Sequence, residues 1–194
     1  MRKIVATLLF GLLLMAGSPQ FVAAQNDVSI VGSTDLSFEF QAYPTGLIPG
    51  IRLERNFGQR NAAHLRLGYQ LIDHRDLGKH SDETGSGYGL TLGYKRYFKD
   101  AHEGFSLGLK TDLWFNAIDW IEEPTSPSPP VRLGSTDIIV LQPTLEGGYL
   151  FTFGPSWVFT PSLAFGFEWN ISTKGEPTGE GAIVLLGFSL GKRF

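Results

Sequence analysis

The sequence predicts an all-β fold: an eight-stranded antiparallel up-and-down transmembrane β-barrel. From about residue 28 onward, apolar and polar side chains alternate with a period of two, which is the period of a strand and not of a helix. The alternation breaks at turn-forming residues, and these breaks divide the chain into eight segments. The connections after the second, fourth and sixth segments are short, whereas those after the third, fifth and seventh are long and polar. An even strand number with this order of connections is typical of a barrel in an outer membrane.

The first 24 residues have the composition of a secretory signal peptide. Arg2 and Lys3 are followed by an apolar stretch, and small residues at 22–24 form a cleavage site. We therefore expect residues 1–24 to be removed and residues 25–194 to form one domain. Without Arg2 and Lys3, 14 Lys and Arg face 19 Asp and Glu, a net charge of −5, which argues against a nucleic-acid partner. The chain has no Cys, so no disulfide contributes to its stability.

Each expected strand has one apolar and one polar face. The eight strands are expected at about residues 28–42, 47–57, 62–72, 86–98, 105–118, 136–151, 157–170 and 181–194, and the long loops at 73–85, 119–135 and 171–180.

The apolar face is expected to point outward, toward lipid. On the apolar face, aromatic residues gather at both ends of the strands. Two aromatic belts on either side of an aliphatic band are what the two interfaces of a bilayer select. They are Phe57, Phe98, Phe105, Phe151, Trp157 and Phe194 at the end with the short turns, and Tyr69, Tyr88, Phe115, Phe167 and Trp169 at the end with the loops. The polar parity then points into the lumen.

The last strand ends in an aromatic residue, with Phe188, Leu190 and Phe194 on its apolar face. With the exported N-terminus and the strand count, this resembles the small eight-stranded outer-membrane barrels of the OmpA and OmpX type over residues 28–194. The resemblance implies a monomer in the outer membrane of a Gram-negative bacterium, in contact with outer-membrane lipid, and it implies that Phe188, Leu190 and Phe194 are read by the barrel-assembly machinery. Lys192 departs from the usual apolar residue, and its stem can snorkel to the interface.

The lumen is expected to hold a network of paired charges, because an unpaired charge in a confined site costs several kcal/mol. Five acids, five bases and one histidine have the inward parity: Glu39, Arg52, Glu54, His64, Arg66, Lys95, Lys110, Asp112, Glu146, Glu168 and Arg193. Such a network leaves no open pore.

An apolar group on the inward parity is expected in the outer half of the lumen: Ile48, Trp114, Ile118, Ile138, Val140, Ile183 and Leu185. One interpretation is a packed core. The other is a cup for an acyl chain or another small apolar ligand, reached sideways through a seam weakened by Pro143 and Pro161. In outline this second arrangement resembles the lipid A palmitoyltransferase barrels, and it would include lipid-modifying acyltransfer or deacylation.

Two loops offer further candidates. The 73–85 loop holds His74 and His80 with Asp73, Asp76, Ser81, Asp82 and Glu83, residue types that serve in a His-acid-Ser set or as cation ligands, or that are merely solvated. The 119–135 loop, with Trp120, Ile121 and a proline run, is expected to expose the most apolar surface. The sequence thus favours a non-enzymatic protein, without cofactor or metal, that has a structural role or binds an extracellular protein or surface ligand through its loops.

Overall fold

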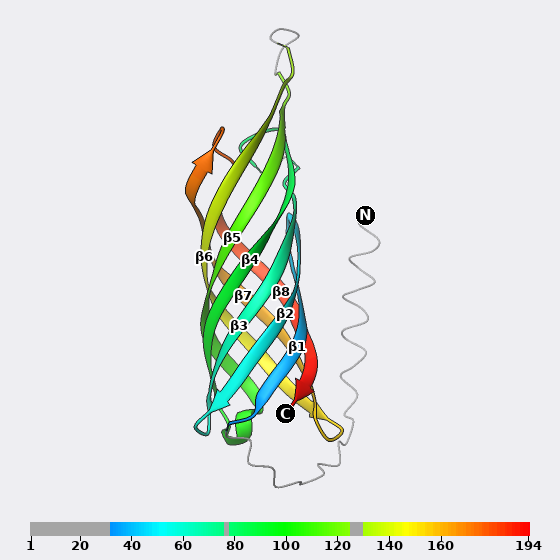
Figure 1. Cartoon of the computed structure of the whole chain (residues 1–194), viewed down its shortest axis with the longest axis vertical. Coiled ribbons are helices and arrows are strands. Elements are labelled where there is room, and N and C mark those ends of the chain that lie inside the picture. Colours follow the sequence, from blue (N-terminus) through cyan, green and yellow to red (C-terminus); the bar gives the residue numbers. More distant parts are fainter. Residues whose placement is uncertain (1–31, 76–77, 125–129) are drawn as a thin grey trace.

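A computed structural model describes residues 32–75, 78–124 and 130–194, so the expected signal peptide lies outside the described residues. The chain forms eight antiparallel strands, and each pairs with the next until β8 closes on β1 (Figure 1). The strands are β1 (Thr34–Tyr43), β2 (Gly46–Phe57), β3 (Asn61–Asp73), β4 (Asp82–Tyr97), β5 (Gly104–Glu122), β6 (Arg132–Phe153), β7 (Trp157–Lys174) and β8 (Gly181–Arg193). The predicted fold class and strand count are confirmed.

The barrel has a turn end, where short connections join β2 to β3, β4 to β5 and β6 to β7, and a loop end opposite. β8 closes the ring by pairing with β1 from Asp35↔Arg193 to Ala42↔Leu186, and at the turn end Phe194 exchanges two further backbone hydrogen bonds with Thr34, both of 2.9 Å. The connection between β4 and β5 contains a short helix, η2 (Asp100–His102), which places the fully buried His102 edge-on against Tyr97. Among the described residues, no helix is long and apolar enough to cross a membrane.

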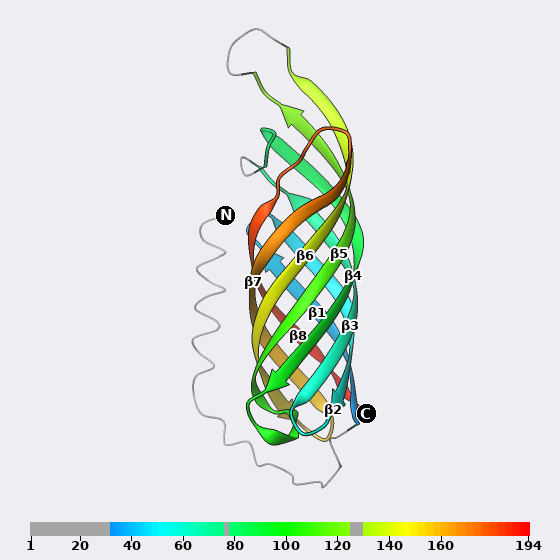
Figure 2. The ribbon, with the colours of Figure 1, turned by 90° about the vertical axis from the view of Figure 1, so that its left-hand side faces the viewer.

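Several strands run further toward the loop end than the sequence indicated. β4 begins at Asp82, and β7 continues to Lys174. The two ends of the expected 119–135 loop are a paired hairpin of β5 and β6, with register pairs from Asp119↔Ser135 to Glu122↔Arg132. This hairpin stands beyond the rest of the barrel in both views (Figures 1 and 2). The prediction of a loop was therefore wrong at residues 119–122 and 132–135, because the cross-strand partners decide where pairing stops.

The apolar parity faces outward. Leu67, Leu92, Leu109 and Leu186 each expose more than three fifths of their surface, whereas inward neighbours such as Arg66 and Thr91 are 1% exposed. Exposed aromatic and aliphatic residues occur on all eight strands, and all eleven residues of the two predicted aromatic belts are exposed. A closed antiparallel ring with an apolar exterior and a polar interior leaves no open sheet edge, which is what a bilayer requires. The chain is therefore a transmembrane barrel.

Irregularities concentrate in the pairing of β6 with β7. The register shifts between Ile139 and Val140, because Ile139 lies opposite Ser172 and Val140 opposite Asn170, which leaves Ile171 as an extra residue. Pairing is also interrupted at Pro143 and around Pro161, where the ring nitrogen offers no donor. This wall of the barrel therefore departs most from a regular sheet.

Candidate functional site

The middle of the lumen is organised around Arg52. Its guanidinium contacts the carboxylates of Glu39 at 2.8 Å, Glu54 at 3.0 Å and Glu146 at 3.5 Å, and it lies 2.9 Å from His64 Nδ1. All of these groups are buried. A single cation thus joins side chains from β1, β2, β3 and β6.

A second centre lies one layer nearer the loop end. Arg66 donates to Glu39 at 2.7 Å, to Gln41 at 2.8 Å, to Thr91 at 2.9 Å and to Asp112 at 2.6 Å. Glu39 therefore links the two arginines. An eight-stranded barrel is just wide enough for its interior side chains, so these groups fill the cross-section.

Nine of the eleven predicted lumen charges form this connected set, which we call the lumen network. Lys95 joins it through Glu54 at 2.8 Å, and Lys110 joins it through Glu146 at 2.9 Å. Arg193 lies apart, in a two-pronged pair with Asp35 at 2.7 and 2.8 Å near the turn end. In the described part of the chain, no ion pair joins Glu168 to the lumen network.

Sequence reasoning missed several members of the interior. Asp35, Gln41, Thr91 and Tyr97 are buried, and Tyr97 donates to Glu54 at 3.0 Å. All four have the inward parity of their strands, so the alternation alone would have identified them. Gln41, Thr91 and Tyr97 are uncharged and so fell outside a set defined by charge, whereas Asp35 is a charged residue of the inward parity that the predicted set lacked.

The seven predicted cup residues come together in the outer half of the lumen. They are 0–4% exposed and pack in one cluster with Tyr43, Ile72 and Ala164. Trp114 lies at its base, donates to Gln142 at 3.0 Å, and covers Gly89, where an added Cβ would lie only 2.2 Å from the indole. The cluster is filled by its own side chains, so a ligand there would have to displace them.

Glu83 organises the loop end above this cluster. Its carboxylate accepts hydrogen bonds from the N–H groups of Lys79 at 2.9 Å, His80 at 3.2 Å and Gly179 at 3.1 Å, and lies 3.2 Å from His74 Nδ1. Burial raises the pKa of Glu83, but the hydrogen bonds from His74 and from the Gly179, His80 and Lys79 amides outweigh it and lower the pKa to about 2. One carboxylate thereby holds the β3–β4 and β7–β8 connections together.

The histidines and Ser81 of the predicted His-acid-Ser set make contacts that hold the β3–β4 connection in place. His80 stacks on Trp120 at 4.2 Å and lies 3.1 Å from Glu122, while the Ser81 hydroxyl accepts from the Glu123 N–H. Within the described residues, no hydrogen bond joins either histidine to the Ser81 hydroxyl, and no group of three or more His, Asp or Glu is arranged to hold a metal. Asp76 lies outside the described residues.

Trp120 is not the exposed loop residue that the sequence indicated. It belongs to β5, is 5% exposed, and donates to Thr136 at 3.1 Å, with the Arg132 guanidinium 5.6 Å from its ring. Because Trp120 has the inward parity of β5, its side chain stacks on His80 and is shielded from solvent, which explains why the prediction of an exposed Trp120 was wrong. Ile121, one residue on, points the other way and is 37% exposed.

Ile121, Val131 and Leu133 form an apolar group on the projecting hairpin, which we call the hairpin patch. Leu133 is 72% exposed and Val131 is 54% exposed. The exposed residues Asp119, Ser135 and Asp137 lie between this patch and the outer aromatic belt at Phe115. Because a polar row separates the two apolar surfaces, the hairpin patch is distinct from the surface that faces lipid.

Comparison with known proteins gave structural matches only. A scan against protein families and a search of curated proteins found no sequence match. Among solved structures, the chain is similar to the N-terminal β-barrel domain of Pseudomonas aeruginosa OprF (13% identity, 84% of this chain and 98% of that one, TM-score 0.47). It is also similar to the Yersinia pestis attachment invasion locus protein Ail in complex with the heparin analogue sucrose octasulfate (12% identity, 84% of this chain and 99% of that one, TM-score 0.46). A third similar structure is that of Neisserial surface protein A (11% identity, 84% of this chain and 95% of that one, TM-score 0.45). The geometry above, independent of these matches, identifies the chain as a closed eight-stranded antiparallel transmembrane β-barrel.

Proposed function

We propose that this protein is a monomeric outer-membrane barrel that captures an extracellular protein partner through the hairpin patch. Its location is supported by the apolar exterior between two aromatic belts, which matches a bilayer with two water-facing interfaces. In this placement the turn end is periplasmic and the loop end is extracellular. Cleavage after residue 24 and recognition of Phe188, Leu190 and Phe194 by the assembly machinery complete the proposal.

The proposed role is neither conduction nor catalysis. The lumen network occupies the middle of the barrel, and the packed apolar cluster lies above it. The polar groups at the loop end contact one another and hold the loops in place. These contacts support a barrel that acts as a rigid base for its extracellular surface.

The hairpin patch is the observation that carries the proposal. Beyond the outer belt the exterior becomes polar, and then three apolar side chains reappear on the part of the molecule that projects furthest. Exposed apolar groups bordered by polar residues mark protein interaction sites. The neighbouring Glu122, Glu123 and Arg132 carry mixed charge, so the patch suits an apolar protein surface better than a polyanion.

The test compares bacterial cells that display the wild-type protein, Leu133→Ser, Val131→Ser or the control Asp119→Ser. Adhesion is measured on surfaces coated with fibronectin, laminin or collagen, together with aggregation between cells. We expect both apolar substitutions to reduce adhesion several-fold, with heat-modifiable gel mobility unchanged, and the control to adhere like the wild type. Adhesion that survives both apolar substitutions, or that falls equally in Asp119→Ser, would contradict the proposal.

A further inference from the structure

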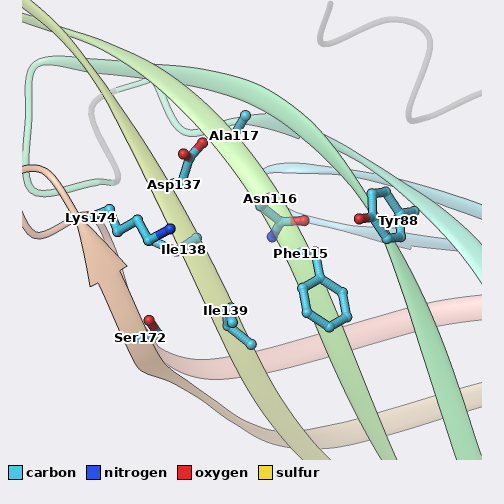
Figure 3. Close-up of a pocket in the computed structure, with 9 residues that line it drawn as sticks. All are labelled: Tyr88, Phe115, Asn116, Ala117, Asp137, Ile138, Ile139, Ser172 and Lys174. Carbon is cyan, nitrogen blue, oxygen red and sulfur yellow. The ribbon is translucent and has the colours of Figure 1, made fainter.

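A groove of about 420 Å³ lies on the outer wall of the barrel, across β4, β5, β6 and β7, and it is separate from the hairpin patch (Figure 3). Its lower part is apolar, with the stacked rings of Tyr88 and Phe115, 5.5 Å apart, beside Ile139. Tyr88 and Phe115 belong to the outer aromatic belt, so the groove begins at the level where acyl chains meet headgroups.

The groove follows from the irregular pairing of β6 and β7. The extra residue Ile171 shifts the register beside Ile139 and places Ser172 and Lys174 along the groove wall. A bulge of this kind bends its strand and redirects the side chains that follow it. Ala117, a small outward residue of β5, leaves the opposite side of the groove open.

The upper rim carries two opposite charges that form no ion pair with each other. Asp137 and Lys174 are register partners, but in the part of the chain that the structure describes no ion pair joins either of them to another side chain. Figure 3 shows the Lys174 amine directed over Ile138, while the Asp137 carboxylate points away from that amine, toward Ala117. The groove therefore offers a cation near its apolar part and an anion further out.

We propose that this groove binds one membrane lipid whose headgroup carries a phosphate and a primary amine. An acyl chain lies on Tyr88, Phe115 and Ile139, the phosphate accepts hydrogen bonds from Lys174, and the amine donates to Asp137. This order of charges matches a phosphoethanolamine headgroup, in which the phosphate lies next to the apolar part and the ammonium lies beyond it. A headgroup with phosphate alone leaves Asp137 unpaired, and a trimethylated amine cannot donate a hydrogen bond to it.

Native mass spectrometry of the intact mature protein tests this proposal. Detergent-solubilised protein is titrated with phosphatidylethanolamine, phosphatidylglycerol or phosphatidylcholine that carry the same acyl chains. We expect phosphatidylethanolamine to bind about two- to five-fold more tightly than the other two, the range that a partly exposed ion pair provides. Lys174→Gln and Asp137→Asn each remove this preference.

Two further variants separate shape from charge. Ala117→Trp fills the groove while keeping both charges, and it is expected to weaken the binding of all three lipids. Lys99→Gln makes the same charge change at the exposed turn end and is expected to bind like the wild type. Heat-modifiable mobility confirms that each variant is folded. Equal binding of the three lipids by the wild type, tighter binding of phosphatidylglycerol, or a preference that survives Lys174→Gln and Asp137→Asn would overturn the proposal.

Discussion

Replacing Arg66 with leucine tests whether the lumen network stabilises the barrel as a connected unit. Arg66 is 1% exposed and holds Glu39, Gln41, Thr91 and Asp112 at 2.6–2.9 Å. Glu39 retains Arg52 after the substitution, but Asp112 loses the only cation it contacts among the described residues. Removing one partner of a buried ion pair costs roughly 3–5 kcal/mol, because the other charge stays buried and uncompensated. We expect the free energy of unfolding to fall by about that amount.

The assay is reversible urea unfolding of the protein in lipid vesicles, followed by tryptophan fluorescence and by gel mobility without boiling. The double variant Arg66→Leu/Asp112→Leu removes both charges and is expected to recover about 2 kcal/mol relative to Arg66→Leu, within the range of couplings between contacting residues. Arg60→Leu, which breaks the exposed pair with Asp100, serves as a control and is expected to leave the unfolding midpoint unchanged. A loss below about 1 kcal/mol for Arg66→Leu, or a double variant less stable than the single one, would refute the reasoning.

The remaining predictions concern the loop end and the glycine beneath Trp114. Glu83→Gln weakens the docking of the β3–β4 and β7–β8 connections, so the amides of Lys79, His80 and Gly179 are expected to exchange hydrogen at least several-fold faster, while amides in β3 and β8 stay unchanged. Because the pKa of Glu83 is lowered to about 2, its carboxylate holds the two connections together at every pH above its usual pKa, and this stabilisation is lost only as the pH falls toward 2. Loss of the protection of the Gly179 amide already at pH 5, relative to an unfolded chain at the same pH, would contradict this. Gly89→Val places its Cβ about where the Trp114 indole lies, 2.2 Å away, and is expected to destabilise the barrel by about 1–3 kcal/mol in the same urea assay. Gly147→Val, where an added Cβ meets nothing within 4 Å, is its matched control.

The faces of the strands could be predicted from the sequence because the two-residue period is fixed by covalent geometry. Once strands such as β3 were recognised, Leu65 and Leu67 had to point one way and His64 and Arg66 the other. The lumen charges followed from the same rule. Their pairing did not, because the contact between Arg66 and Asp112 depends on the stagger of β3 against β5 around the closed ring.

The loop end could not be predicted in this way. Glu83 looks like one acid in a polar loop, and its role depends on the Gly179 amide, 96 residues away. Trp120 was placed in a loop because of the prolines that follow it, whereas its pairing with Gly134 extends the hairpin. Where chain segments meet only through tertiary contacts, the local pattern carries no information about the partner.

The central claim is that the apolar parity faces lipid and the polar parity faces the lumen, and oxygen accessibility of spin labels measures it most directly. The chain contains no cysteine, so single cysteines can be introduced without other changes, at Leu90, Thr91 and Leu92 of β4 and at Ser106 and Leu107 of β5. For protein in lipid vesicles, we predict high collision rates with lipid-dissolved oxygen at 90, 92 and 107, and low rates or poor labelling at 91 and 106. The opposite alternation, or equal accessibility at neighbouring positions, would contradict a barrel that faces lipid with its apolar side.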